Sequence, residues 1–151
     1  FDMTPNVDMA IECIDVNVSS AIGTAVTVEL WVRPGTCVGF DTSPTGWTSL
    51  GVGTGLSAGV DLPTNIDFSG NGYAFAAGQL YGVFVDIQSA SARYTNGGPT
   101  TFSNADLEVV TYFGKSGWGS TFTYREWNGA IYYVPSGLTL SLGQLQSQGL
   151  G

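Results

Sequence analysis

The sequence contains no histidine, and only four of its 151 residues are Lys or Arg. The absence of histidine excludes a Ser-His-Asp or Cys-His catalytic arrangement, and it leaves the cysteines without histidine partners for a zinc site. The net charge of −8 argues against binding to nucleic acid or to an anionic membrane surface, since both require basic patches. No apolar run approaches the roughly 18 residues of a membrane span, so no membrane insertion is expected.

Cysteine is also scarce, with Cys13 and Cys37 as the only two. An even number of cysteines in an exported β-protein favours a disulfide, so we predict a Cys13–Cys37 bridge, with two buried free thiols as the alternative. No signal peptide is visible, because Phe1 follows neither a basic region nor an initiator methionine. We therefore expect a mature, processed product.

Charged residues make up 11% of the chain, less than half of the typical value of about 25%. Glycine is abundant, with 22 residues, and aromatic residues reach 13%. No segment of useful length has the 3.6-residue apolar period of a helix. This composition indicates a single all-β domain that is secreted or extracellular.

Short apolar segments, separated by Gly, Pro and Asn turns, predict eight or nine strands. The expected strands cover residues 7–18, 25–32, 37–40, 47–52, 60–68, 80–87, 92–95, 106–113 and 130–134. Residues 80–87 are apolar on both faces, so this strand should be central. Together the strands predict a two-sheet sandwich of jelly-roll type over residues 1–137, with a strand-like C-terminal tail over residues 138–151.

Arg125 and Trp127 lie in a turn that leads into the last predicted strand. An arginine beside a tryptophan can bury its stem, bind a carboxylate and lie on an aromatic face. We predict that these two residues form a structural clamp that closes the sandwich. The alternative is a ligand-binding Arg-Trp pair.

Other residues are candidates for ligand or modification sites. Trp118, between two glycines in a loop, is the best candidate for stacking on a sugar ring, whereas Trp31 and Trp47 are expected to fill the core. Asn17 starts the sequon Asn17-Val18-Ser19, although it also fits a polar residue at the end of a strand.

Calcium binding is a further alternative, because oxygen ligands can converge on a loop. The candidates Asp41, Asn104 and Asp106 are explained equally well by Asx turns. No enzymatic activity and no cofactor are expected, since the carboxylates that a glycosidase would need occur singly on alternating strands.

The tail has the alternation of a half-buried strand, with Leu138, Leu140 and Leu142 separated by Thr139 and Ser141. Leu145 extends this apolar character, and the tail carries no charge. A sheet edge left open near Phe1 could recruit such a segment, because unpaired backbone groups require partners. The tail is therefore a candidate donor strand from a neighbouring subunit. The alternatives are that it completes its own domain or is disordered.

A set of segments resembles, in the same order, a recurring secreted bacterial β-sandwich domain of surface proteins: residues 32–40, 46–51, 80–85, 94–97, 103–107 and 125–129. The resemblance covers residues 1–134 and implies a sandwich module at the bacterial cell surface, without catalytic residues. The chain is also similar, more loosely, to jelly-roll protomers of extracellular bacterial filaments. We therefore expect a structural subunit that binds further copies of itself and assembles into a filament through strand exchange. The alternative function is a carbohydrate-binding or adhesive surface module, for which glycans would be the partners.

Overall fold

The structure, a computed structural model, describes residues 1–136. These residues form strands and no helix, so none of them belongs to a helix that could cross a membrane. The strands are β1 (Asp2–Pro5), β2 (Met9–Val16), β3 (Ala25–Pro34), β4 (Thr48–Leu56), β5 (Thr64–Asp67), β6 (Tyr81–Ile87), β7 (Tyr94–Asn96), β8 (Thr100–Ser103), β9 (Leu107–Thr111), β10 (Phe113–Lys115), β11 (Thr121–Thr123), β12 (Arg125–Trp127) and β13 (Gly129–Pro135). The predicted all-β sandwich is confirmed, with thirteen strands in place of eight or nine.

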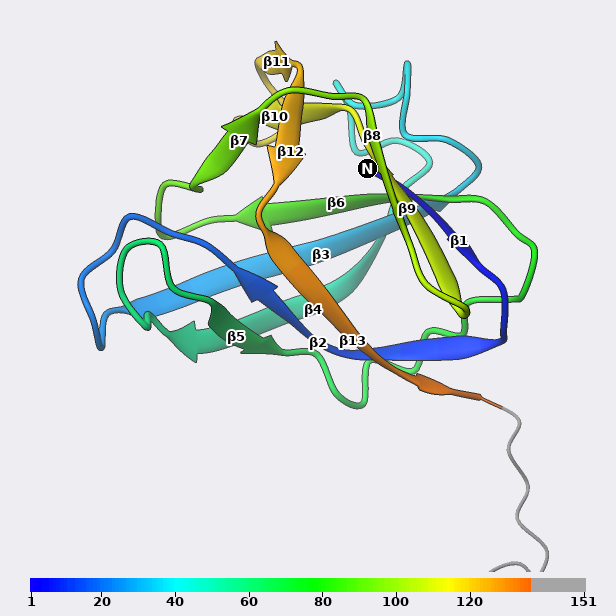
Figure 1. Cartoon of the computed structure of the whole chain (residues 1–151), viewed down its shortest axis with the longest axis horizontal. Coiled ribbons are helices and arrows are strands. Elements are labelled where there is room, and N and C mark those ends of the chain that lie inside the picture. Colours follow the sequence, from blue (N-terminus) through cyan, green and yellow to red (C-terminus); the bar gives the residue numbers. More distant parts are fainter. Residues whose placement is uncertain (137–151) are drawn as a thin grey trace, which may run out of the picture.

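The strands form two main sheets and two small ladders (Figure 1). The larger sheet has the order β4-β3-β6-β1-β9-β8, and the smaller has the order β13-β2-β5. The ladders β10-β11 and β12-β7 lie above β6 in Figure 1. Every strand pair within the sheets and ladders is antiparallel.

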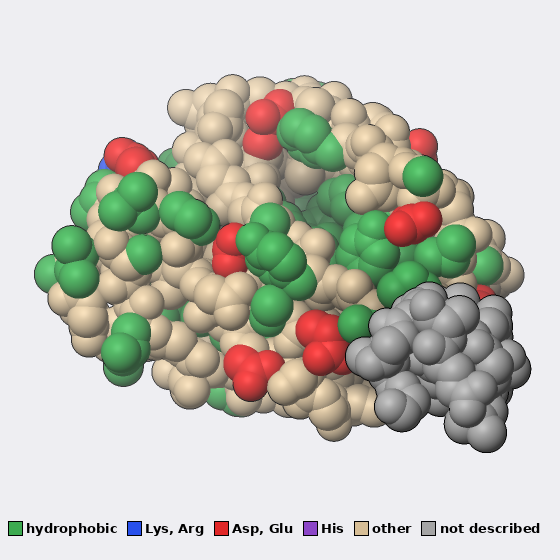
Figure 2. All heavy atoms as spheres, turned by 60° about the horizontal axis from the view of Figure 1, so that its bottom comes forward, with side chains coloured by type: hydrophobic (Ala, Val, Ile, Leu, Met, Phe, Trp, Pro, Cys, Tyr) green, Lys and Arg blue, Asp and Glu red, His purple; other side chains and the backbone are tan. Residues whose placement is uncertain are grey.

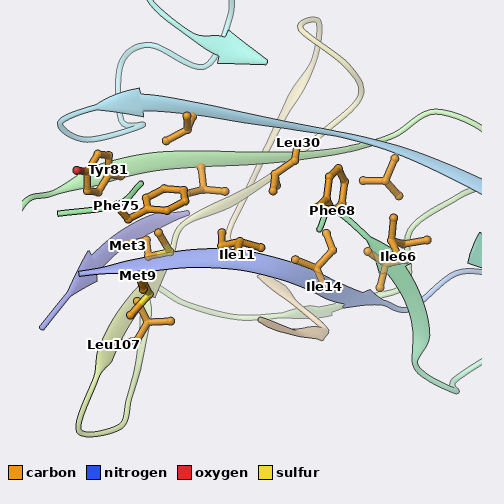
Figure 3. Packing of buried hydrophobic residues seen from close by; sticks show 14 of the residues in the cluster. Met3, Met9, Ile11, Ile14, Leu30, Ile66, Phe68, Phe75, Tyr81 and Leu107 are labelled. Atoms are coloured by element: carbon orange, nitrogen blue, oxygen red, sulfur yellow. The ribbon is translucent and has the colours of Figure 1, made fainter. Parts of the chain in front are cut away.

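The core lies between the two main sheets (Figure 3). β3 supplies one face of alternating buried residues, as its sequence predicts: Val26, Val28, Leu30 and Val32. The facing strand β2 buries Met9 and Ile11 and then, after a change of phase, Ile14 and Val16. A β-bulge opposite Tyr132 and Tyr133 explains this change, because an extra residue turns the following side chains to the other face.

β6 is central, as predicted, with β3 on one side and β1 on the other. The strand β1 is absent from the sequence prediction, which begins its first strand at residue 7. Its segment contains an aspartate and a proline, both depleted in strands. The fold accommodates Asp2 because its buried carboxylate accepts hydrogen bonds from the Cys37 N–H at 2.7 Å and the Thr36 hydroxyl at 2.6 Å.

These hydrogen bonds also explain why the strand predicted over residues 37–40 is wrong. The segment forms a turn in which the Phe40 N–H donates to the Cys37 carbonyl, and Gly39 has a φ of 83°. The strand predicted over residues 60–68 shrinks to β5, because Asp61, at φ 61°, and Pro63 lie in the preceding loop. The prediction also misses the short strands β8, β10, β11 and β12.

The predicted disulfide is wrong: Cys13 and Cys37 are both free thiols. Cys13 lies in β2 of the smaller sheet, opposite Tyr132 of β13 and Asp67 of β5, and it follows the phase change. Cys37 is buried beside Asp2 of the larger sheet. One thiol therefore lies in the smaller sheet and the other in a turn beside the larger sheet, and burial raises the pKa of the Cys37 thiol to about 11.

Candidate assembly site

Half of the central strand β6 has an open edge. At its start, Tyr81 and Gly82 pair with β1, and Val83 exchanges two hydrogen bonds with Phe1: its N–H donates to the Phe1 carbonyl at 2.8 Å and its carbonyl accepts from the Phe1 amine at 3.0 Å. Beyond Phe1, no strand among the described residues continues this pairing.

The direction of the remaining backbone groups follows from the alternation of an antiparallel strand. Val83 bonds on the β1 side, so Val85 and Ile87 direct their N–H and C=O groups to that same side. The backbone N–H of Gln88 points to the other side, since it donates to the carbonyl of Thr27 in β3. Within residues 1–136, Val85 and Ile87 have no backbone hydrogen bond across the open edge.

The open edge faces a hollow of about 390 Å³, which we call the β6 slot. One wall is β6 from Val83 to Ile87, and the opposite wall is formed by the β10-β11 and β12-β7 ladders. Its lining includes Val85, Asp86 and Ile87 of β6, together with Phe1, Ala90, Tyr94, Phe122 and Trp127. Val85, Ile87, Phe1, Ala90 and Trp127 also pack against the core, so the inner part of the slot is apolar.

Arg125 and Trp127, the predicted clamp, form part of the outer wall. The Trp127 ring stacks on Phe1 with centroids 5.2 Å apart, and the Arg125 guanidinium lies over the Tyr94 ring at 4.8 Å. Arg125 donates to the carbonyls of Thr123 and Tyr124. A structural role for the two residues stays a prediction.

Both wall residues keep a buried N–H group without an acceptor. Trp127 Nε1 and Arg125 Nε have no hydrogen-bond partner among the described residues. Buried donors in folded proteins are almost always paired. A ligand that brings carbonyl oxygens into the slot would supply acceptors next to these residues.

Trp118 does not have the exposed position expected for a sugar platform. It is half-buried and packs edge-on against three aromatic rings, with centroid distances of 5.4 Å to Trp31, 5.5 Å to Trp47 and 4.9 Å to Phe84. The prediction that Trp31 and Trp47 fill the core is also wrong, because this cluster contains Phe84, on the face of β6 opposite to the core residues Val83 and Val85.

Asp41, one of the calcium candidates, is held in a polar cluster. Its carboxylate accepts from Lys115 Nζ at 3.2 Å and from the Thr121 hydroxyl at 2.5 Å, and the Lys115 side chain is only 6% exposed. Burial acts to raise the pKa of Asp41, but the hydrogen bonds from Thr121 and from the backbone, together with Lys115, bring it below its usual value. The cluster ties the loop after β3 to the β10-β11 ladder.

Asn104 and Asp106, the other calcium candidates, belong to the turn between β8 and β9. The Asn104 side-chain oxygen accepts from the N–H groups of Asp106 and Leu107, which is an Asx turn. Asp106 accepts from the Tyr133 hydroxyl at 3.1 Å. The structure does not bring these residues together with Asp41, and no cluster of three potential acidic or cysteine ligands occurs in the described part of the chain.

Asn17, the predicted glycosylation site, is half-buried, and its side-chain oxygen accepts from the Asp61 N–H at 3.1 Å. Leu138, Leu140, Leu142 and Leu145, the predicted assembly residues, lie outside the described residues.

A second depression, the β13 groove, has a volume of about 310 Å³ and lies between β13 and the β8-β9 edge. Its lining contains no charged residue: Phe102, Ser103, Asn104, Leu107, Val109, Thr111, Trp127, Gly129, Ala130, Ile131 and Tyr133. On the face drawn in Figure 2, hydrophobic side chains gather around a hollow, with acidic side chains nearby and almost no Lys or Arg.

Sequence reasoning missed the open edge at Val85 and Ile87. The apolar pattern of residues 80–87 indicates a buried strand, but it cannot show which length of that strand lacks a neighbour. Pairing depends on Phe1, whose place beside Val83 follows from the unpredicted strand β1.

Comparison with known proteins adds no assignment: no family model, no curated protein and no solved structure matches this chain.

Proposed function

We propose that this protein is a structural subunit of an extracellular bacterial filament and that it polymerises through strand exchange. The observation that carries the proposal is the open edge of β6 at Val85 and Ile87, inside an apolar slot. Unpaired N–H and C=O groups on a sheet edge recruit a further strand, and apolar pockets beside them select its side chains.

The position of the slot supports an open-ended assembly. The slot lies beside Phe1, whereas the described chain leaves the sandwich after β13, where the Ser136 N–H donates to Asp8. Figure 1 shows the end of β13 on the opposite side of the molecule from the β12-β7 ladder. A contact between two different surfaces at opposite ends of a subunit is heterologous, and it produces a filament when the rotation between subunits does not close into a ring.

The proposal is tested by removing one backbone donor from the slot. The backbone N–H and C=O of Val85 point to the slot side, so Val85→Pro deletes an N–H that β3 does not use. Val85→Thr is the matched control, since it keeps the N–H and nearly the same shape. We expect wild-type protein and Val85→Thr to form filaments in negative-stain microscopy and Val85→Pro to stay monomeric with a native circular-dichroism spectrum. A folded Val85→Pro protein that assembles like the wild type would contradict strand exchange at β6.

A carbohydrate-binding or adhesive module is the second candidate, favoured by two aromatic rings at the slot. Tyr94 and Phe122 line it and are 52% and 47% exposed. Aromatic rings in this position can stack on sugar faces. Glycan-array binding that is lost in Tyr94→Ala and Phe122→Ala, with filament formation unchanged, would favour this function.

A further inference from the structure

We infer that the β6 slot binds Leu138–Leu142 of a second copy of this chain, as a strand in line with β1 and antiparallel to β6. This inference rests on the proposed strand exchange and adds the identity, direction and register of the inserted segment.

The reach of the chain favours a second copy over the segment's own subunit. Trp127 lines the slot, and β13, which begins two residues later, extends about 20 Å away from it between Gly129 and Pro135, at roughly 3.3 Å per residue. Leu138 can lie at most about 7 Å beyond Ser136. Leu138–Leu142 therefore cannot fill the slot of its own subunit, whereas it can enter the slot of a neighbour placed end to end.

The geometry of β6 determines the register. A residue opposite Val85 or Ile87 in a hydrogen-bonded pair points to the same face as they do, which is the core face. A strand antiparallel to β6 approaches Phe1 with its C-terminal end. Leu140 then lies opposite Ile87, Leu142 lies opposite Val85, and Gly143 lets the chain turn away before Phe1.

This register matches the chemistry of the slot. The two leucines face Phe1, Ala90 and Trp127, the apolar inner part. Thr139 and Ser141 face outward, toward the side of Phe84 and Asp86. The tail has no charged residue, so it brings no unpaired charge into the slot. Its backbone carbonyl groups can accept hydrogen bonds from the unpaired N–H groups at Arg125 Nε and Trp127 Nε1.

The register is tested by disulfide cross-linking between two full-length single variants. Isotope-labelled Val85→Cys protein is mixed with unlabelled Leu142→Cys protein under assembly conditions and then oxidised. A hydrogen-bonded antiparallel pair has a Cα separation of about 5.5 Å, which a disulfide can span. Ser141→Cys is the matched control, because its side chain points to the other face, and wild-type protein mixed with Leu142→Cys reports the background from Cys13 and Cys37.

We expect a mixed-label dimer from Val85→Cys with Leu142→Cys, formed at least tenfold faster than with Ser141→Cys. Filaments without this cross-link would overturn the inference and leave strand exchange by another segment as the explanation. A cross-link from Leu142→Cys to Val109→Cys in the β13 groove would also overturn it.

A binding assay separates the inference from the proposed filament. A fluorescent peptide of residues 137–144 is titrated into full-length monomer and compared with the same peptide carrying Leu140→Asp and Leu142→Asp. Binding that Val85→Pro weakens at least tenfold supports the slot even if the protein forms no filaments, in which case only the proposed function fails. Equal binding of the two peptides contradicts the inference whether or not filaments form.

Discussion

Two strands of the larger sheet differ in how closely other parts of the chain pack against them. β4 packs closely against β5, whereas part of β6 faces a hollow. At the β4 side the sheet approaches β5 so closely that side chains on Gly53 and Gly55 would collide with the backbone carbonyls of Asp67 and Asn65. This glycine seam closes the sandwich. At β6, the hydrogen-bonding groups of Val85 and Ile87 face an open slot. The fold therefore covers one strand by close packing and leaves half of a central strand without a neighbour among the described residues.

The largest effect is expected at the closed seam. Gly55→Val places a branched side chain against the Asn65 carbonyl and Ile66, so the free energy of unfolding should fall by about 3 kcal/mol or more. Urea denaturation measures the change. Val52→Thr, on the same strand but 56% exposed, should shift the free energy by less than about 0.5 kcal/mol. Equal effects of the two changes would show that the seam is not closely packed.

The slot side contains instead a partly buried ion pair between Lys115 and Asp41. Lys115→Met leaves the Asp41 carboxylate without its cation, and we expect a loss of about 1–2 kcal/mol, between the values for exposed and for fully buried pairs. Thermal unfolding measures the loss. Adding Asp41→Leu should recover much of it, because both members of the pair are then apolar. A double variant less stable than the single one would refute this account of the polar cluster.

The two thiols should differ in their rate of alkylation. Cys37 is buried with its pKa raised to about 11, whereas Cys13 is half-buried in the smaller sheet. Because the thiolate is the reactive form, iodoacetamide at pH 8 should modify Cys37 at least tenfold more slowly than Cys13. Mass spectrometry of chymotryptic peptides, which separate the two cysteines by cleavage after Leu30 or Trp31, gives both rates. Modification of neither residue until a reductant is added would instead indicate the disulfide that the structure lacks.

The smallest effect concerns Asp86 at the slot. Burial raises the pKa of Asp86, against the hydrogen bond from Gln88 and with a contribution from Glu29. The folded state therefore binds the Asp86 proton more tightly than the unfolded state. The protonated carboxyl contributes fully to the free energy of unfolding below the unfolded pKa of about 3.9, and this contribution is lost as the pH rises through the folded pKa.

Asp86→Asn removes this dependence. At pH 7 the variant should be more stable than the wild type by a fraction of a kcal/mol, since the site is partly solvated. The difference should vanish near pH 3. Parallel denaturation curves at the two pH values measure it, and a variant that is less stable at pH 7 would contradict the burial of the charge.

The closed part of the fold was largely predictable from the sequence. The alternation of apolar residues in β3 identifies its core face, because a strand buried on one face needs an apolar residue at every second position. The continuous apolar pattern of residues 80–87 identifies the central strand, because burial on both faces needs apolar residues at successive positions. The bulge in β2 has no clear signal in the sequence, so the phase change before Ile14, and with it the position of Cys13, was not predicted.

The open part was not predictable for a physical reason. The strands β10, β11 and β12 contain three residues each, too few for a period to be recognised. Asp2 is a residue type that predicts a loop. It lies in a strand because its carboxylate accepts hydrogen bonds from Thr36 and Cys37, which are distant in the sequence. Whether Val85 has a neighbour is a property of pairing between distant segments, which residue type alone does not encode.

Hydrogen exchange at the amides of Val85 and Ile87 tests the central claim most directly. In the monomer these two N–H groups should exchange much faster than that of Val83, which donates to Phe1. After assembly, quenched and dissolved filaments should show all three amides protected. Protection of Val85 and Ile87 already in the monomer, or exchange in the filament as fast as in the monomer, would contradict the account.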